Sequence, residues 1–280
     1  MEKYGETLKQ IRKSLNMSQN KLSNGIMSQS NYSKVENGEI DIPFSKMTKL
    51  LDKLGMSMTE FIYIHQKNQK TPEHQLSRLN QLMPGDLIKI KENIHELKAI
   101  KEPTQREEEI LAIFEALDSI AKDDYETANE KVTMVWKRLK KHDTWYLYDI
   151  RLINSILYLF PTDVAGSIVN LALKRLDYYK NLRNFSKTSA NLQINYLLLL
   201  MKDGEYQKAL TTSEKLIDYS LKHHLDQHLA ATYVRKGIIL ENLQEPNSSE
   251  WYKKGFDLLE IINNKKMIQE LTKEMTFYSG

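Results

Sequence analysis

Apolar residues recur at intervals of three and four along the first 65 residues, a pattern typical of short amphipathic helices. Leu8, Ile11 and Leu15 mark the first of them. Four more segments follow, and each begins at a serine that can cap a helix: Ser18, Ser28, Ser45 and Ser57. Gly38 and Gly55 are suited to end the third and fourth segments, since glycine tolerates positive φ. The pattern predicts five short helices over residues 1–65.

From residue 76 onward the same spacing continues in longer stretches separated by prolines, and predicts helix nearly throughout. Three short motifs resemble one another, because an aromatic residue is followed three positions later by a small one: Tyr125 and Ala128, Tyr206 and Ala209, Tyr252 and Gly255. A small residue there lets two helices pack closely, and the aromatic ring is expected to fill the gap between units. The alternative is chance similarity in a helical chain rich in tyrosine. We predict an all-α protein with a tetratricopeptide-like helical repeat domain over residues 76–280, whose unit is about 40 residues.

A polar run at residues 66–75 contains no aliphatic residue, and Pro72 is expected to interrupt any helix through it, so we predict a linker there. The balance of basic and acidic residues also changes at this linker. Residues 1–70 hold 11 Lys and Arg against 7 Asp and Glu, whereas the rest of the chain holds 29 against 30. A basic module joined to a nearly neutral body is typical of a nucleic-acid binder with a second function.

Several classes of function are excluded by what the chain lacks. It has no cysteine, and therefore no disulfide, thiol nucleophile or cysteine zinc site. No apolar run approaches the roughly 20 residues that cross a bilayer, and the N-terminus lacks a signal-peptide segment, so we expect a cytoplasmic protein with no membrane partner. His224 and His228 have no third metal ligand nearby in sequence, nucleotide and hydrolase motifs are missing, and the acidic run Glu107–Glu109 is most simply a solvated helix end. We expect no enzyme activity, no cofactor and no metal.

Residues 18–39 fit a helix-turn-helix, in which a scaffold helix, a tight turn and a recognition helix follow one another. The turn falls near Gly25–Met27, which places Gln29 and Asn31 in the first turn of the recognition helix. Gln and Asn side chains can pair with adenine through two hydrogen bonds. Glu36 is unusual on a helix that faces DNA, and we assign it a structural role, paired with Arg12.

The predicted contacts with double-stranded DNA therefore combine base readers, a phosphate brace and backbone cations. Gln19, at the start of the scaffold helix, is placed to brace a phosphate. The complete set is Arg12, Lys13, Gln19, Lys21, Ser28, Gln29, Ser30, Asn31, Ser33 and Lys34.

These residues also carry a resemblance to a known family. The Ser18-Gln19-x-x-Leu22 start and the Leu50–Leu54 end resemble phage-repressor-like helix-turn-helix modules, although the chain is one residue shorter than that pattern between Leu22 and Ser28. Met27–Glu39, Leu50–Leu54 and Glu60–His65 together are similar to the Rgg/MutR-type transcriptional regulators of Gram-positive bacteria. The resemblance covers residues 1–65 firmly and the remainder by length and helical character. It implies a five-helix DNA-binding domain over residues 1–65.

The resemblance further implies a homodimer whose C-terminal repeat domain binds a short peptide pheromone in its concave face, in a quorum-sensing role. RNA polymerase is a further candidate partner. Some relatives link their DNA-binding domains through a disulfide, which this chain cannot form because it has no cysteine. Its dimer is therefore expected to depend on helix packing.

A receptor for an extended peptide needs side-chain amides and guanidinium groups along inward-facing helices, since the peptide exposes its own amides and carbonyls. Two sets of residues that share a helical face fit this requirement: Tyr148, Arg151, Asn154 and Tyr158 form one row, and Asn191 and Asn195 form the other. A weaker third row contains Arg235. The predicted peptide-binding residues are Tyr148, Arg151, Asn154, Tyr158, Asn191, Asn195 and Arg235. For any one of them, a polar plug within the repeat packing is the alternative.

Two other functions remain open at this point. The chain could be a regulator of the same architecture that responds to a protein partner or to no ligand, with repeats that serve only dimerisation. It could also be a repeat-domain inhibitor that binds a kinase or phosphatase, with a vestigial N-terminal module.

Overall fold

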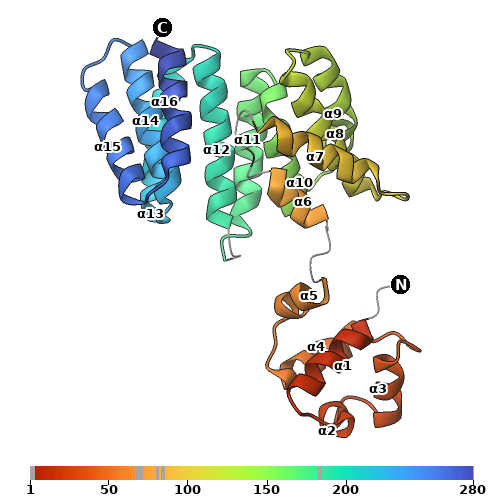
Figure 1. The fold of residues 1–280 in the computed structure, drawn as a ribbon. Helices are drawn as coiled ribbons and strands as arrows, with labels where there is room; N and C mark the ends of the chain where they lie inside the picture. The colour runs from red at the N-terminus through yellow and green to blue at the C-terminus, as the bar shows by residue number, and fades with distance from the viewer. Residues whose placement is uncertain (1–3, 67–71, 80–81, 83–85, 182–184, 280) are drawn as a thin grey trace. The chain divides into compact units, whose positions relative to one another are not determined.

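The computed structural model describes residues 4–66, 72–79, 82, 86–181 and 185–279. Within these ranges every regular element is a helix and no strand is present, so the predicted all-α fold is confirmed. The chain divides into two compact units, Met1–Thr71 and Pro72–Gly280 (Figure 1). We describe each unit by itself.

The described part of the N-terminal unit, residues 4–66, contains five helices that surround a small apolar core. They are α1 (Tyr4–Ser14), α2 (Gln19–Ser23), α3 (Gln29–Glu36), α4 (Phe44–Leu54) and α5 (Met58–Gln66). The core takes one or more side chains from each helix, including the fully buried Leu8, Leu22, Tyr32, Leu50 and Phe61. This burial is what stabilises helices that are too short to be stable alone.

Local capping sets where these helices begin and end. The hydroxyls of Ser18, Ser28 and Ser57 accept hydrogen bonds from backbone N–H groups three residues later, at 3.1, 3.2 and 3.1 Å. Gly38 and Gly55 have positive φ, as predicted for the ends of α3 and α4. The cap predicted at Ser45 is wrong.

The error at Ser45 has a simple cause. Helix α4 begins at Phe44, directly after Pro43, so Ser45 already lies inside the first turn. Proline holds φ near the helical value, here −59°, and its missing N–H costs nothing at a helix start. The proline therefore starts the helix one residue before the serine.

Gly5 is required where α1 crosses the end of α3. A Cβ atom at this position would lie 1.7 Å from the carbonyl oxygen of Val35 and 2.7 Å from its carbonyl carbon. Both atoms belong to the backbone and cannot swing aside. Only glycine lets the two helices approach this closely.

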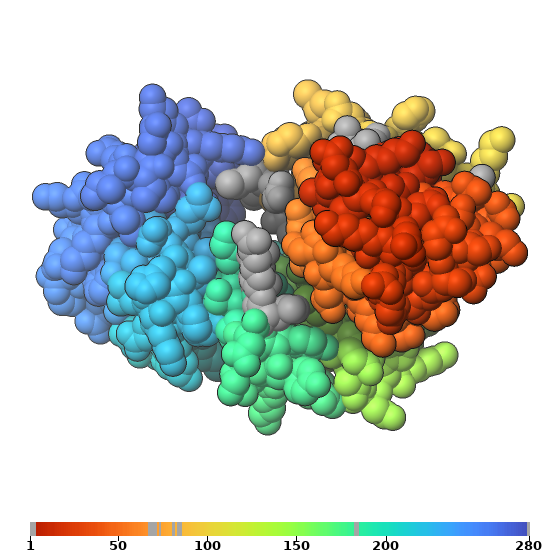
Figure 2. Space-filling view, turned by 90° about the horizontal axis from the view of Figure 1, so that it is seen from below, coloured from red at the N-terminus to blue at the C-terminus, as the bar shows by residue number. Residues whose placement is uncertain are grey.

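The second unit is an array of helices connected by short turns. They are α6 (Pro72–Leu79), α7 (Leu87–Lys98), α8 (Gln105–Ile120), α9 (Tyr125–Leu139), α10 (Leu147–Ile156), the 3-10 turn η1 (Leu157–Leu159), α11 (Thr162–Asp177), α12 (Phe185–Lys202), α13 (Tyr206–Lys222), α14 (Asp226–Asn242), α15 (Ser248–Ile261) and α16 (Lys265–Ser279). Helices α8 and α9 form an antiparallel pair, and from α11 onward each helix packs antiparallel against the next (Figure 1). In the space-filling view they form a continuous curved band from green through teal to blue (Figure 2).

The predicted linker is shorter than residues 66–75. Gln66 is the last residue of α5, and Pro72 is the first residue of α6, so residues 72–75 form a helical turn. Proline is favoured at this first position, where it starts a helix rather than interrupting one. Residues 67–71 lie outside the described residues.

The repeated aromatic and small residues have partly the predicted role. Ala128, Ala209 and Gly255 are all buried, and a Cβ on Gly255 would lie 2.5 Å from Val234 Cγ2 and 2.8 Å from the carbonyl oxygen of Ala230. The small residue therefore permits close packing of α15 on α14, as predicted. The aromatic part of the prediction is wrong at Tyr125, which begins α9 but is 49% exposed and fills no gap.

One acidic residue expected in solvent is buried. Glu109 of α8 is only 2% exposed, because the guanidinium of Arg138 donates a hydrogen bond to its Oε2 at 3.1 Å. The same guanidinium donates to Asp149 Oδ1 at 2.9 Å. The prediction of a solvated helix end is wrong here, since Glu109 of α8 and Asp149 of α10 share the guanidinium of Arg138 on α9.

Candidate functional site

The exposed face of α3 carries most of the residues predicted to contact DNA. Gln29, Ser30, Asn31 and Lys34 are all exposed, and Ser33 is half-buried behind them. The backbone N–H of Asn31 is capped by Ser28, which fixes the first turn of the helix. This arrangement gives α3 amides at its start and a cation in its last turn.

Two predicted backbone cations lie outside α3. Lys13, near the end of α1, and Lys21, within α2, are both exposed. Their side chains make no ion pair with another described residue, so their charge is available to solvent or to a polyanion.

A chain of hydrogen bonds connects α3 to the interior of the unit. Glu36, only 1% exposed, accepts from Arg12 Nε at 2.6 Å and from Arg12 Nη2 at 2.9 Å. It also accepts from Gln19 Nε2 at 2.8 Å, and the Oε1 atom of Gln19 accepts from Gln29 Nε2 at 2.7 Å. The predicted pairing of Glu36 with Arg12 is confirmed, and through Gln19 it reaches the exposed amide of Gln29.

Arg12 is not available to neutralise the DNA backbone, as the sequence had suggested. It is 8% exposed, and besides Glu36 its Nη1 donates to the carbonyl oxygen of Met17 at 2.6 Å. Because its donors are used inside the unit, we remove Arg12 from the candidate DNA contacts. The sequence had assigned Arg12 both a pairing with Glu36 and a contact with DNA, and only the pairing is present in the structure.

Burial and hydrogen bonding act in opposite directions on the ionisation of Glu36. Burial favours the neutral acid and would raise its pKa, but the hydrogen bonds from Arg12 and Gln19 and the charge of Arg12 outweigh burial. The pKa of Glu36 therefore lies below its ordinary value. The carboxylate stays charged at neutral pH, which keeps the chain of hydrogen bonds to Gln29 intact.

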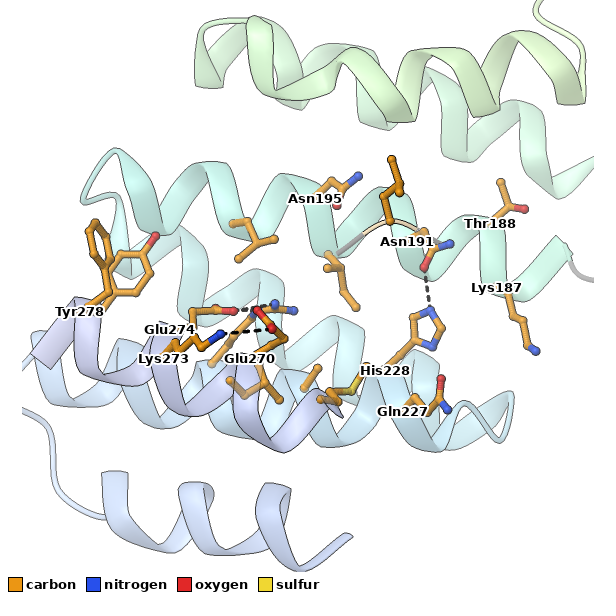
Figure 3. Close-up of a pocket in the computed structure, with 18 of the residues that line it drawn as sticks. Lys187, Thr188, Asn191, Asn195, Gln227, His228, Glu270, Lys273, Glu274 and Tyr278 are labelled. Atoms are coloured by element: carbon orange, nitrogen blue, oxygen red, sulfur yellow. Dashed lines mark hydrogen bonds and ion pairs between the residues drawn. The ribbon is translucent and has the colours of Figure 1, made fainter. Parts of the chain in front are cut away.

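The repeat unit contains a pocket of about 1110 Å³, bordered mainly by α12, α14 and α16 (Figure 3). Each of these helices offers one face to it, because the lining positions recur at three- and four-residue intervals. Helix α12 contributes Lys187, Thr188, Asn191, Ile194, Asn195 and Leu198. Helix α14 contributes Gln227, His228, Ala231 and Arg235, and α16 contributes Met267, Glu270, Leu271, Lys273, Glu274, Phe277 and Tyr278.

Four of the seven residues predicted to bind a peptide line this pocket. They are Arg151, Asn191, Asn195 and Arg235. Asn191 accepts a hydrogen bond from His228 Nε2 at 2.8 Å, which joins α12 to α14 (Figure 3). Arg235 donates two hydrogen bonds to Glu274, at 2.8 and 2.9 Å, which join α14 to α16.

The other three predicted residues do not line the pocket. Asn154 is 7% exposed, and its Oδ1 atom accepts from Asn195 Nδ2 at 3.1 Å, so it supports a lining residue instead. Tyr148 packs under the guanidinium of Arg106, 4.5 Å from the ring centroid. The hydroxyl of Tyr158 is buried without a hydrogen-bond partner among the described residues, and this burial raises its pKa. Tyr148, Arg151 and Asn154 lie on α10 as predicted, but Tyr158 lies in the 3-10 turn η1, and only Arg151 of the four lines the pocket.

The sequence analysis missed the contributions of Lys187, Gln227 and the whole of α16. A signal for α12 was present, since its six lining positions share one helical face in the sequence. For α16 the sequence offers no equivalent, because its lining face mixes acids, a base and apolar residues. Only its packing on α14 determines which side faces the pocket.

Two features are absent from the residues that the structure describes. No helix among them is long and apolar enough to cross a membrane. Across the same residues, no cluster of three or more His, Cys, Asp or Glu side chains could hold a metal ion.

Comparison with known proteins identifies the family. A model of the C-terminal domain of the HTH-type transcriptional regulator Rgg matches residues 87–273, and a helix-turn-helix model matches residues 8–61. No curated protein matches the chain.

Solved structures show the same fold at low identity. PlcR of Bacillus thuringiensis, solved in complex with the peptide PapR7 and DNA, is 20% identical with a TM-score of 0.70, over 97% of this chain and 99% of that one. The SHP pheromone receptor Rgg2 of Streptococcus dysgalactiae is 15% identical with a TM-score of 0.71, over 98% and 99% of the two chains. A proposed transcriptional regulator of Listeria monocytogenes EGD-e is 17% identical with a TM-score of 0.78, over 99% and 97%.

The match to the Rgg C-terminal domain spans well over half of the 280 residues, and the helix-turn-helix model accounts for most of the N-terminal unit. The chain therefore belongs to the Rgg family of HTH-type transcriptional regulators.

Proposed function

We propose that this regulator binds DNA through α3 and acts in the cytoplasm as a homodimer, and that a short peptide in the pocket of the repeat unit controls its DNA binding or its activation of transcription. The observation that carries the proposal is that one chain combines an exposed recognition helix with a pocket lined by side-chain amides and guanidinium groups. Quorum sensing is the biological setting that this combination serves.

The chemistry of the pocket suits a peptide. Its volume of about 1110 Å³ exceeds the roughly 300–1,000 Å³ usual for small-molecule sites. Asn191, Asn195 and Arg151 present donors and acceptors for peptide groups, while Ile194 and Leu198 present apolar surface for side chains. PlcR and Rgg2, which share the fold, are described respectively as a complex with a peptide and DNA and as a pheromone receptor.

Control by a peptide requires the peptide to bind two conformations of the regulator with different affinity. A change in the spacing of the two DNA-binding units of a dimer, or in a surface that contacts RNA polymerase, would convert that difference into regulation. With no cysteine in the chain, the dimer is held by noncovalent packing alone.

The DNA half of the proposal is tested by band-shift titration on DNA from upstream of the gene. We expect Gln29→Ala to weaken specific binding by about 1–3 kcal/mol, and Lys34→Ala to weaken binding to all sequences and lower the salt slope by about 1. Lys49→Ala, which removes an exposed lysine of α4, is the matched control. Wild-type affinity and salt slope in both α3 variants would overturn the assignment of α3.

The peptide half is tested by calorimetry against short apolar peptides encoded next to the gene. Arg151→Ala and Asn195→Ala should weaken binding, since both residues line the pocket, whereas Lys215→Ala on the exposed side of α13 should not. Equal binding by all three variants would place the peptide elsewhere.

The exposed polar face of α3 favours DNA binding over the protein-inhibitor alternative. An inhibitor with a vestigial N-terminal module would bind one cytoplasmic protein in a pull-down experiment and would bind no specific DNA. A regulator whose repeats serve only dimerisation would bind DNA but no peptide, and the two assays above separate these cases.

A further inference from the structure

Charge is unevenly paired around the pocket. Two of its cations are matched by carboxylates of α16: Arg235 by Glu274, at 2.8 and 2.9 Å, and Lys273 by Glu270, at 3.5 Å. Lys187 on α12 differs, since no carboxylate among the described residues lies within 4.0 Å of its ammonium group. The pocket therefore has one unmatched lysine.

This lysine lies at one end of the pocket. Helices α12, α14 and α16 run in the same direction, since one antiparallel helix separates each from the next (Figure 1). Figure 3 shows Lys187, Asn191 and Asn195 in this order along α12, with Gln227 and His228 of α14 beside the lysine. The N–H groups at the starts of α12 and α14 add to the positive potential at this end.

The neighbours of Lys187 supply neutral hydrogen-bonding groups. Burial is the main cause that lowers the pKa of His228, and the charges of Lys187 and Arg235 lower it further, so the ring is neutral near pH 7. With the Asn191 oxygen as acceptor, His228 donates from Nε2 at 2.8 Å. The Nδ2 group of Asn191 makes no hydrogen bond with another described residue and can donate to a bound acceptor.

The opposite end of the pocket is aromatic and apolar. Phe277 is 79% exposed although it lines the pocket. It precedes Tyr278 near the end of α16, and Figure 3 shows Tyr278 at the end of the pocket away from Lys187. Leu198 lines the pocket from the corresponding part of α12. An uncovered phenylalanine beside a cavity favours an apolar occupant.

We propose that the pocket holds its ligand in one direction, with a carboxylate at Lys187 and apolar side chains toward Phe277 and Leu198. This inference rests on the proposed peptide binding and adds the chemistry that orients the peptide. The carboxylate can be the C-terminus of the peptide or an Asp or Glu side chain near the end that Lys187 binds.

The test uses the full-length protein and three pools of synthetic heptapeptides of Leu, Ile, Val, Phe and Gly. One pool has free C-terminal carboxylates, one has C-terminal amides, and one has amides with Asp as the last residue. Retention of each pool is measured by equilibrium dialysis with mass spectrometry. For wild type we expect the best-retained sequences to bind about two- to fivefold more weakly as plain amides, a loss typical of one exposed ion pair.

Substitution assigns the effect to Lys187. Lys187→Gln should lower the affinity for carboxylate peptides to that for amides and leave the amides unchanged, whereas Lys215→Gln should behave as wild type. Restored binding by the pool that ends in Asp amide identifies a side-chain carboxylate as sufficient, and failure to restore it identifies the C-terminus.

The outcomes separate the two proposals. If peptides are retained equally as acids and amides, peptide binding stands and the proposed direction is wrong. A carboxylate preference that survives Lys187→Gln also overturns the assignment and points to Arg151. If no pool is retained in any form, peptide control itself fails and this inference fails with it.

Discussion

In the N-terminal unit the polar side chains of the recognition helix are connected to a buried ion pair, whereas in the repeat unit polar side chains border an open pocket. Arg12 and Glu36 are shielded from water, and Gln19 carries their hydrogen bonding to Gln29. Arg235 and Glu274 form a similar two-bond pair, but Glu274 is partly exposed at the pocket wall. The Arg12–Glu36 pair fixes the side chains of the recognition helix before DNA binds. The Arg235–Glu274 pair lies at the pocket, where its contacts within the protein can be exchanged for contacts with a ligand.

This comparison predicts that the buried pair contributes more to stability. Glu36→Ala should lower the free energy of unfolding of the N-terminal unit by about 3–5 kcal/mol, because the guanidinium of Arg12 would stay buried without its carboxylate. Urea unfolding of the full-length protein, followed by a probe in that unit, measures the loss. The double variant Arg12→Met/Glu36→Leu should recover most of it, since it leaves no buried charge. A loss below about 1 kcal/mol in Glu36→Ala would contradict the comparison.

A second prediction compares the close helix crossings of the two units. Gly5→Ala should destabilise the N-terminal unit by about 2 kcal/mol, because the new Cβ meets the backbone of Val35. Gly255→Ala should cost the repeat unit less, since the nearest backbone atom there, the carbonyl oxygen of Ala230, would lie 2.8 Å from the new Cβ rather than 1.7 Å. Thermal unfolding of both variants checks the order, and an equal or reversed order would count against it.

The third prediction concerns the pair at the pocket. Glu274→Ala should destabilise the repeat unit by only about 1 kcal/mol, because water in the pocket can take the place of the carboxylate beside Arg235. Unfolding in urea gives the value, with Glu245→Ala on the exposed turn after α14 as a control. A loss as large as that in Glu36→Ala would show that the two pairs are equivalent.

The smallest expected effects are two separate pH dependences. Since the pKa of Glu36 is lowered, its stabilisation of the N-terminal unit is complete above about pH 4.3 and is lost as the pH falls through the lowered value. The pKa of His228 is also lowered, mainly by burial, so the repeat unit loses stability as the pH falls below about 6.5. Unfolding monitored unit by unit across pH 3–7 tests both, and His228→Gln should abolish only the second.

Much of the N-terminal unit could be predicted from the sequence because its features are local. Caps such as Ser18 and Ser28 depend on neighbours three residues away, and the pairing of Arg12 with Glu36 follows from an acid placed on a helix that should face DNA. The error at Ser45 arose from a competing local signal, the proline before it.

The pocket could be predicted only in part, because it is assembled from distant helices. Asn191 and Asn195 lie one turn apart on a single helix, a spacing that sequence reveals. Whether Asn154 faces the pocket or supports Asn195 depends on how α10 is rotated against α12, which no local pattern encodes. The contribution of Glu274 depends in the same way on the packing of α16.

The alternation of lining and core positions on α12, α14 and α16 has a consequence for how these regulators diversify. Leu192 and Leu200 on α12, like Val234 and Ile238 on α14, are fully buried and hold the repeats together, while exposed lining positions such as Lys187 and Gln227 lie outside that core. Mutations can therefore retune ligand choice one position at a time under weak folding constraint.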